Sequence, residues 1–245
     1  MQQTPSTSAH KSYSSLNRHI RPLLFDIIPI KHWIYDSLHT ILKISDRLWE
    51  LFLSDLQRGH LMLNENMQNL ILTEMKRLRI NHFHFWIERS TQSSSCTSLM
   101  GPNKLNILEN FSFTSFISKE FSQEHANQLR QLWTGFFELY KIMTLANITG
   151  SEFKIKAESW LKLFLIPSKG QPNRPNFIHR MYRVTNVIPY IHVLVCHVHE
   201  LINIHQEFGI AAFDCSAIEK KNHLQVCLYF QSTLKDGGYE NYRWS

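Results

Sequence analysis

One stretch near the C-terminal end restricts the fold more than any other, because apolar side chains and histidines share it at helical spacing. Its apolar side chains, between Pro189 and Phe208, recur at the spacing of one helix face. They are Ile191, Leu194, Val195, Val198, Leu201, Ile202 and Ile204. Gly209 stands where a left-handed residue commonly ends a helix. The spacing predicts one long helix over residues 189–208, which carries His192, Cys196, His197, His199 and His205.

A second helix is predicted after a short link of small residues, 209–213. It begins at Ser216 and runs to about Leu234, where an Asp-Gly-Gly sequence closes it. Glu219 lies in its first turn and is followed by Lys220, Lys221, Asn222 and His223. We expect this helix to pack beside the histidine-bearing helix, with the carboxylate of Glu219 turned toward a basic hollow.

The rest of the chain indicates a mainly α fold (α+β) with few short strands. Further helices are predicted over residues 38–56, ending at Gly59, and over 64–79, 101–111, 122–145 and 149–165, the last opened by the capping box Thr149-Gly150-Ser151-Glu152. Residues 82–88 alternate like a strand, and residues 23–30 are predicted to be a strand or a buried extended segment. Residues 90–98 are predicted to form a Ser-rich flexible link. The proline-rich loop 167–177 is predicted to bring Arg174, Arg180 and Arg183 to the histidine-bearing stretch. We expect a disordered tail, 1–19, and one mostly helical domain, 20–245.

Composition limits the class of protein. The 245 residues are 43% hydrophobic, which is enough for a substantial core. Neither a membrane span nor a secretion signal is recognisable, so we expect an intracellular protein. The cysteines Cys96, Cys196, Cys215 and Cys227 are scattered without a Cys-x-x-Cys pair, which predicts free thiols. The net charge of +6 is diffuse and compatible with a polyanionic partner.

Two carboxylates are candidate catalytic groups, Glu219 and Asp36. Glu219 could hold a divalent metal ion near a phosphodiester, because oxygen ligands suit magnesium and neighbouring bases suit phosphate. The candidate phosphate-binding bases are Arg180, Arg183, Lys220, Lys221 and His223. The alternative for Glu219 is a capping box with Ser216, in which it only satisfies helix amides. The alternative for Asp36 is a plain charge at a helix N-terminus.

The histidines allow two metal geometries, which helix geometry distinguishes. At about 100° per residue, His192, Cys196 and His199 fall on one stripe and would form a local zinc site. His197 lies roughly 140° round from His192, so a His192 and His197 site requires a distorted helix and ligands from elsewhere. The alternative to both is a set of polar histidines on a packed helix.

These residues resemble a known family. The sequence His192-Val-Leu-Val-Cys-His197-Val-His-Glu200, followed by Ser216-Ala-Ile-Glu219-Lys-Lys-Asn222, is similar to the C-terminal catalytic segment of the V(D)J recombination-activating recombinase and Transib-type transposases. Asp36-Ser-Leu-His39, Met100-Gly-Pro-Asn-Lys104 and the helix over 123–140 extend the likeness upstream. The resemblance implies an RNase H-like fold, with a helical insertion over about 23–186 and a catalytic-type segment over 187–236.

The resemblance also implies roles for individual residues. Glu219 would be the last acid of a DDE triad, which binds Mg²⁺ or Mn²⁺, and His192 and His197 would be half of a zinc site. This sequence departs from the family in three ways: it has no Cys-x-x-Cys pair, it lacks the upstream catalytic aspartates, and His199 stands in place of a proline. In a second version Asp36 is the middle acid, and the long interval to Glu219 is the insertion.

We therefore expect a transposase-derived fragment that is inactive alone, because a two-metal site needs several converging carboxylates. Its expected partners are DNA and a second copy of the chain, and its expected location is the nucleus. The alternative function is a non-enzymatic helical module that binds DNA or protein, with or without the local zinc site.

Overall fold

The computed structural model describes residues 32, 34–57, 63–90, 93–117, 121–145, 148–171, 174, 177 and 180–232. Within these ranges the α-helices are α1 (Ser37–Gln57), α2 (Glu65–Arg77), α3 (Gly101–Asn110), α4 (Gln123–Met143), α5 (Gly150–Phe164), α6 (Pro189–Cys196), α7 (Val198–Ile204) and α8 (Ser216–Ser232). The other elements are strands β1 (Phe85–Ile87) and β2 (Ser94–Cys96) and the 3-10 helices η3 (Thr114–Phe116), η4 (Val184–Asn186) and η5 (Ile210–Phe213). The fold is mainly α, as the sequence predicts. The predicted tail, 1–19, and apolar lead-in, 23–30, lie outside the described residues.

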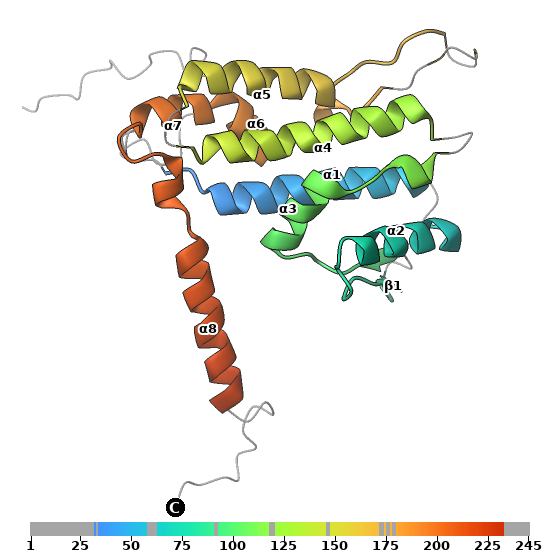
Figure 1. The fold of residues 1–245 in the computed structure, drawn as a ribbon, viewed down its shortest axis with the longest axis horizontal. Helices are drawn as coiled ribbons and strands as arrows, with labels where there is room; N and C mark the ends of the chain where they lie inside the picture. The colour runs from blue at the N-terminus through green and yellow to red at the C-terminus, as the bar shows by residue number, and fades with distance from the viewer. Residues whose placement is uncertain are drawn as a thin grey trace, which may run out of the picture.

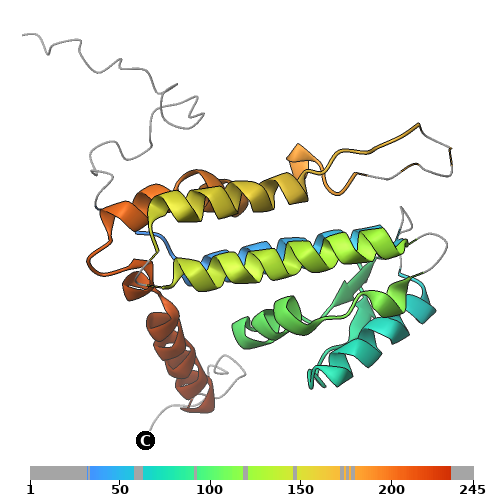
Figure 2. The same ribbon diagram turned by 45° about the horizontal axis from the view of Figure 1, so that its top comes forward.

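The helices pack in layers. α4 contacts α5 on one side and α1 and α3 on the other, while α5 also contacts α6 and α7. Figure 2 shows α5 with α6 and α7 above α1 and α4, and α3 with the hairpin and α2 below them. α8 leaves this body and projects away from it (Figure 1). The expectation that α8 packs beside the histidine-bearing helix is therefore wrong, since neither α6 nor α7 has an extensive contact with it.

An aromatic cluster joins the two lower layers. Phe52 of α1 is fully buried, and its ring centroid lies 5.6 Å from that of Phe111, 5.2 Å from Phe113 and 5.3 Å from Phe116, all edge to face. This is the geometry that aromatic quadrupoles prefer, and each such pair adds about 0.5–1.5 kcal/mol beyond area burial. Buried residues from Tyr35 to Ile210 belong to one hydrophobic cluster, so the described body has a single core.

Local signals set the helix starts. Asn64 accepts a hydrogen bond from the Met67 amide and caps α2, and Ser122 accepts one from the His125 amide and caps α4. The predicted capping box that opens α5 is present in both directions, from Thr149 to Glu152 and back. These caps satisfy amides that would otherwise lack partners in the first turn of each helix.

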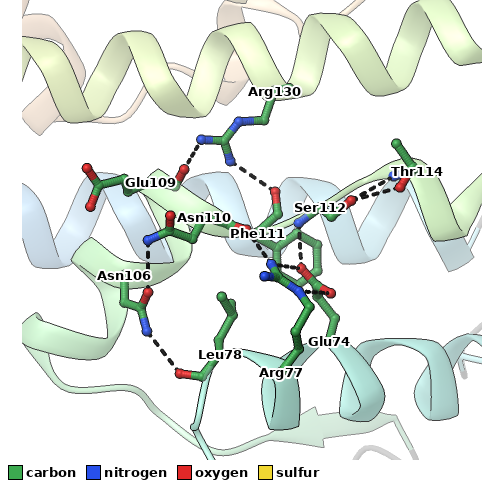
Figure 3. A network of polar contacts seen from close by, with 10 residues as sticks. All are labelled: Glu74, Arg77, Leu78, Asn106, Glu109, Asn110, Phe111, Ser112, Thr114 and Arg130. Atoms are coloured by element: carbon green, nitrogen blue, oxygen red, sulfur yellow. Dashed lines mark hydrogen bonds and ion pairs between the residues drawn. The ribbon is translucent and has the colours of Figure 1, made fainter.

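A buried carboxylate links α2 to the last residues of α3 and the segment after it (Figure 3). Glu74 is 6% exposed, and its Oε1 accepts hydrogen bonds from the Ser112 amide and from Arg77, both at 2.6 Å. Arg77 also donates to the Asn110 carbonyl at 2.5 Å. Arg130 of α4 donates to two carbonyls of the same segment. These bonds fix the chain that carries the aromatic cluster.

The Ser-rich link predicted as flexible is partly a strand. Residues 94–96 form β2, which pairs antiparallel with β1 in the register Phe85 to Cys96 and Ile87 to Ser94. The Trp49 indole donates to Cys96 Sγ at 3.5 Å, which ties the hairpin to α1. Serine is not among the residues enriched in strands, so tertiary contacts decide this segment.

The long helix predicted over 189–208 is wrong, because it breaks into α6 and α7 at His197. His197 has φ −126° and ψ −29°, outside helical values, and its carbonyl accepts from the Glu200 amide. Gly209 does not end the helix either, since α7 ends at Ile204 with His205 as its cap; Gly209 closes the following turn, with φ 70° and its amide donating to the His205 carbonyl. The apolar spacing continues across His197, so the break could not be predicted from that spacing.

Candidate functional site

α1 begins at an acidic residue that caps it. The Oδ1 atom of Asp36 accepts a hydrogen bond from the Leu38 amide at 3.0 Å, and its Oδ2 pairs with Nδ1 of His39. This arrangement is the helix-terminal role that the sequence left as the alternative for Asp36. The side chain of Asp36 is still 26% exposed, so the carboxylate can be reached from solvent.

A second acid, Asp214, anchors α8 to the start of α1. Its Oδ2 accepts a hydrogen bond from Ser37 Oγ at 2.6 Å, and its Oδ1 accepts from the Ser216 amide at 2.7 Å. Burial alone would raise the pKa of Asp214, but the hydrogen bonds from Ser216 and Ser37 outweigh it, so the pKa lies below its usual value. The Asp-x-Ser sequence 214–216 is the signal from which this turn was predictable, because an aspartate side chain readily bonds the amide two residues further on.

The Cys215 thiol lies among the carboxylates at this corner. Desolvation, followed by the charge and hydrogen bond of Asp36, raises the pKa of Cys215 above its ordinary value, and the charges of Asp214 and Glu219 act in the same direction. The thiol therefore stays protonated at neutral pH and is a poor nucleophile and metal ligand. Asp36, Asp214 and Glu219 thus belong to one neighbourhood, which we call the acidic corner.

An open cavity of about 380 Å³ adjoins the acidic corner. Asp36, just before α1, and His39 of α1 line it on one side, and Tyr190 and Val193 of α6 line it on the other. Its volume is within the range of small-molecule sites. The Asp36 and His39 pair therefore faces a space that a small substrate group can enter.

Glu219 itself lies in the first turn of α8 with an exposed side chain. Within the described part of the chain its carboxylate makes no hydrogen bond, and Asp214 holds the Ser216 amide instead. The capping-box alternative for Glu219 is therefore not what the structure shows. Lys220, Lys221 and His223 follow on the exposed surface of the same helix, so this part of the predicted set is brought together.

Arg180 and Arg183 are not brought together with Glu219. The hydroxyl of Tyr182, which lies between these arginines in sequence, donates to Asp55 near the C-terminal end of α1. α8 instead begins beside the N-terminal end of α1, a helix of 21 residues. Such a helix is about 30 Å long. The expectation of one basic cluster around Glu219 fails because the chain reaches α6 from the far end of α1.

The break at His197 places two histidine rings side by side. The ring centroids of His192 and His197 are 5.3 Å apart, at an interplanar angle of 72°. Glu200 lies close by, with its Oε2 3.8 Å from Nδ1 of His197. An unbroken helix would keep the two histidines roughly 140° apart. The distortion that this pair requires is therefore present.

His199 lies near residues of α5 instead, because α7 packs against that helix. Burial, followed by the charge of Lys154, lowers the pKa of His199, while Glu200 and Glu158 oppose this shift. Among the described residues, no group of three or more Cys, His, Asp or Glu side chains is placed to hold a metal ion. Neither the pair His192 and His197 nor the stripe with Cys196 and His199 is a complete metal site in the described part of the chain.

Comparison with known proteins adds no family to these observations. No family model matches the chain, and neither the curated proteins nor the solved structures contain a match. What the structure defines is a mainly α body with one short hairpin and a projecting C-terminal helix. None of the described helices has the length and apolar character needed to cross a bilayer. The cysteines Cys96, Cys196, Cys215 and Cys227 form no disulfide, as predicted.

Proposed function

We propose that this chain derives from the C-terminal part of a DDE recombinase of the V(D)J and Transib type, and that it binds duplex DNA without cutting it alone. The observation that carries this proposal is the contact between the rings of His192 and His197. The resemblance requires these two histidines to act together, and simple helix geometry opposes it. The break at His197 removes that obstacle.

The acidic corner supports the same origin. Glu219 is exposed at the start of α8, and Asp36 lies near the same Cys215 thiol. In the proposed ancestor these acids would hold Mg²⁺ or Mn²⁺, and His192 and His197 would hold Zn²⁺ together with ligands from elsewhere. Such a metal would supply charge stabilisation at the phosphodiester. Asp36, however, is engaged by His39 and by helix amides, which leaves too few free carboxylates for a two-metal site.

Binding to DNA rests on α8. Lys220, Lys221 and His223 are exposed on a helix that stands clear of the body, so phosphates can reach them without rearrangement. Each phosphate neutralised releases counterions and steepens the salt dependence of binding. The chain carries a formal net charge of +6, which favours approach to a polyanion.

A nicking assay on supercoiled DNA tests the catalytic part. The purified chain with Mg²⁺ or Mn²⁺ should leave the DNA intact. Metal-dependent nicking that Glu219→Gln abolishes would overturn the statement that the chain is inactive alone.

Salt-dependent duplex binding tests the DNA part. Replacing Lys220 and Lys221 by glutamine should reduce the slope of log K against log salt by about 1.8, because each phosphate contact contributes about 0.9. The same charge change at Lys154 and Lys156, exposed on α5, is the matched control and should leave the slope unchanged. Absent or salt-insensitive DNA binding would refute this part.

Metal analysis separates the two histidine arrangements. If the His192 and His197 pair contributes to zinc binding, His197→Ala should remove zinc from the purified chain and Cys196→Ser should not. The opposite result would favour the local stripe with His199.

A protein-interaction module is the second candidate, and the surface of α8 favours it. Large apolar side chains on this helix are exposed: Ile218, Leu224, Val226, Leu228 and Tyr229. Several large apolar side chains exposed on one element often mark a protein contact, including contact between two copies of one chain. Sizing by light scattering tests the homodimer version, which Leu224→Lys should disrupt while leaving the helical signal of the body unchanged.

A further inference from the structure

A histidine and a cysteine on α8 present two metal-ligand atoms side by side. His223 and Cys227 are four residues apart, so about one helical turn separates them and they lie on the same face. The Sγ atom of Cys227 is 3.5 Å from the Nε2 atom of His223, and this contact is exposed to solvent. Neither residue belongs to the zinc arrangements described above.

The distance between these two atoms matches one edge of a tetrahedral zinc site. Zinc binds a cysteine sulfur at about 2.3 Å and a histidine nitrogen at about 2.05 Å. With a tetrahedral angle of about 109° between these two bonds, the sulfur and the nitrogen lie about 3.6 Å apart. The observed 3.5 Å therefore allows one Zn²⁺ ion to bind both atoms after a small rotation of the side chains, with the helix unchanged.

One chain supplies only half of such a site. Structural zinc sites hold the metal with four protein ligands, and two cysteines with two histidines are a common set. Among the described residues, no third Cys, His, Asp or Glu is placed to join the pair. A second copy of the chain, related by a two-fold axis, brings the same pair again, because both subunits use the same patch in such an interface. Two copies therefore complete the set of four.

α8 is accessible to a second copy. It projects from the body and makes no extensive contact with the other described elements (Figure 1). At about 100° per residue, Leu224 and Val226 lie roughly 80° to either side of the ligand pair. Both side chains are exposed, at 58% and 51%. A second α8 placed over the pair would cover part of this apolar surface, which favours association.

We propose that His223 and Cys227 bind Zn²⁺ together with the same two residues of a second copy, so that the metal joins two α8 helices. The thiols lose their protons on binding, and two thiolates balance the charge of the ion. His223 is then a neutral zinc ligand instead of a phosphate-binding base. The inference rests on the second candidate function, contact between two copies through α8, and makes that contact depend on metal.

The test measures the mass of the full chain against zinc concentration. The chain is stripped of metal with a chelator, kept in a non-chelating reductant so that no disulfide forms, and titrated with zinc sulfate during light scattering. We expect the mass to double and the chelator to restore the monomer. The dimer should hold one zinc ion per two chains that the Cys227→Ser variant lacks. Cobalt(II) in place of zinc should give the visible absorption of tetrahedral, thiolate-bound cobalt.

Variants of the cysteine assign the ligand. Cys227→Ser should raise the zinc concentration for half-dimerisation at least about 100-fold, since even the loss of an outer partner of a ligand costs about 10–100-fold. Cys227→His should keep the zinc dimer, because two histidines four residues apart on a helix also bind zinc. Cys227→Leu combined with Leu228→Cys keeps the composition but moves the thiol about 100° round the helix, so it should abolish the dimer.

Other outcomes separate this site from the earlier proposals. A zinc dimer that survives Cys227→Ser, or one zinc ion bound by each monomer through Cys227, would overturn the proposal. Loss of the dimer in His197→Ala would do the same, because the metal would then belong to the other histidine pair. A dimer that needs no metal but that Leu224→Lys disrupts would overturn only this inference, whereas a monomer at every zinc concentration would also overturn contact between copies.

Discussion

The buried carboxylate of Glu74 gives the sharpest test of how α2 is held in place. Its bond to the Ser112 amide is charge-assisted and contributes about 1.5–3 kcal/mol. Its pair with Arg77 contributes less, about 0.5–1 kcal/mol, because the arginine side chain is 52% exposed. Glu74→Ala should therefore lower the free energy of unfolding by about 3 kcal/mol.

The partner variant distinguishes a network from a sum of contacts. Arg77→Ala removes this pair but keeps the Ser112 bond, so it should cost about 0.5–1 kcal/mol. The double variant should cost little more than Glu74→Ala, because the pair is already lost in that variant. The coupling energy should therefore be about 0.5–1 kcal/mol.

Urea unfolding followed by circular dichroism measures these values. Arg47 and Glu50 form the matched control: they have the same three-residue spacing, but Glu50 is 63% exposed, so Glu50→Ala should cost at most about 0.5 kcal/mol. Equal losses for Glu74→Ala and Glu50→Ala, or additive losses for Glu74→Ala and Arg77→Ala, would refute the reasoning.

Three further predictions follow from the packing. Gly150→Ala should destabilise the fold by about 1–3 kcal/mol in urea unfolding, because the new Cβ would collide with the backbone of α7, whereas the Cβ of Gly101→Ala at the start of α3 would make only an ordinary van der Waals contact with Leu42 and should not destabilise it. Ser37→Ala should raise the pKa of Asp214 in a carboxyl NMR titration. The stability that the lowered pKa of Asp214 provides is present above about pH 3.8 and lost as the pH falls below it, so this variant should flatten the acid side of the stability curve. A chain that ends at Cys215 should keep the thermal midpoint of the body, since α8 makes no extensive contact with the other described elements; a fall of more than about 5 °C would contradict this.

Much of the fold was predictable because its determinants are local. Apolar spacing and caps such as Ser122 and Thr149 predict helix positions to within a few residues, as α4 and α5 show. The hairpin was not predictable in the same way, because Ser94 and Ser95 become a strand only through pairing with β1. Tertiary contacts override propensity there.

In the candidate site, too, the locally determined features were predictable and the long-range contacts were not. The sequence could place Glu219 in the first turn of a helix and Asp36 at a helix start, because both are properties of neighbouring residues. It could not show that Ser37 and Asp214 hydrogen-bond across the chain, since that contact joins residues 177 positions apart. The break at His197 escaped for another reason: the apolar face continues through it, and the close approach of α7 to Gly150 lies far away in sequence.

The root of α8 has a mechanical consequence. A helix of 17 residues extends about 26 Å, and a short hinge joined to α1 through one serine and one aspartate sets its direction. A turn of this hinge by about 10° would move the distal tip by about 4.5 Å, because the tip lies about 26 Å from the pivot. A small rearrangement around one side chain at the pivot, caused by its protonation or replacement, would thus become a larger displacement at the distal end of α8.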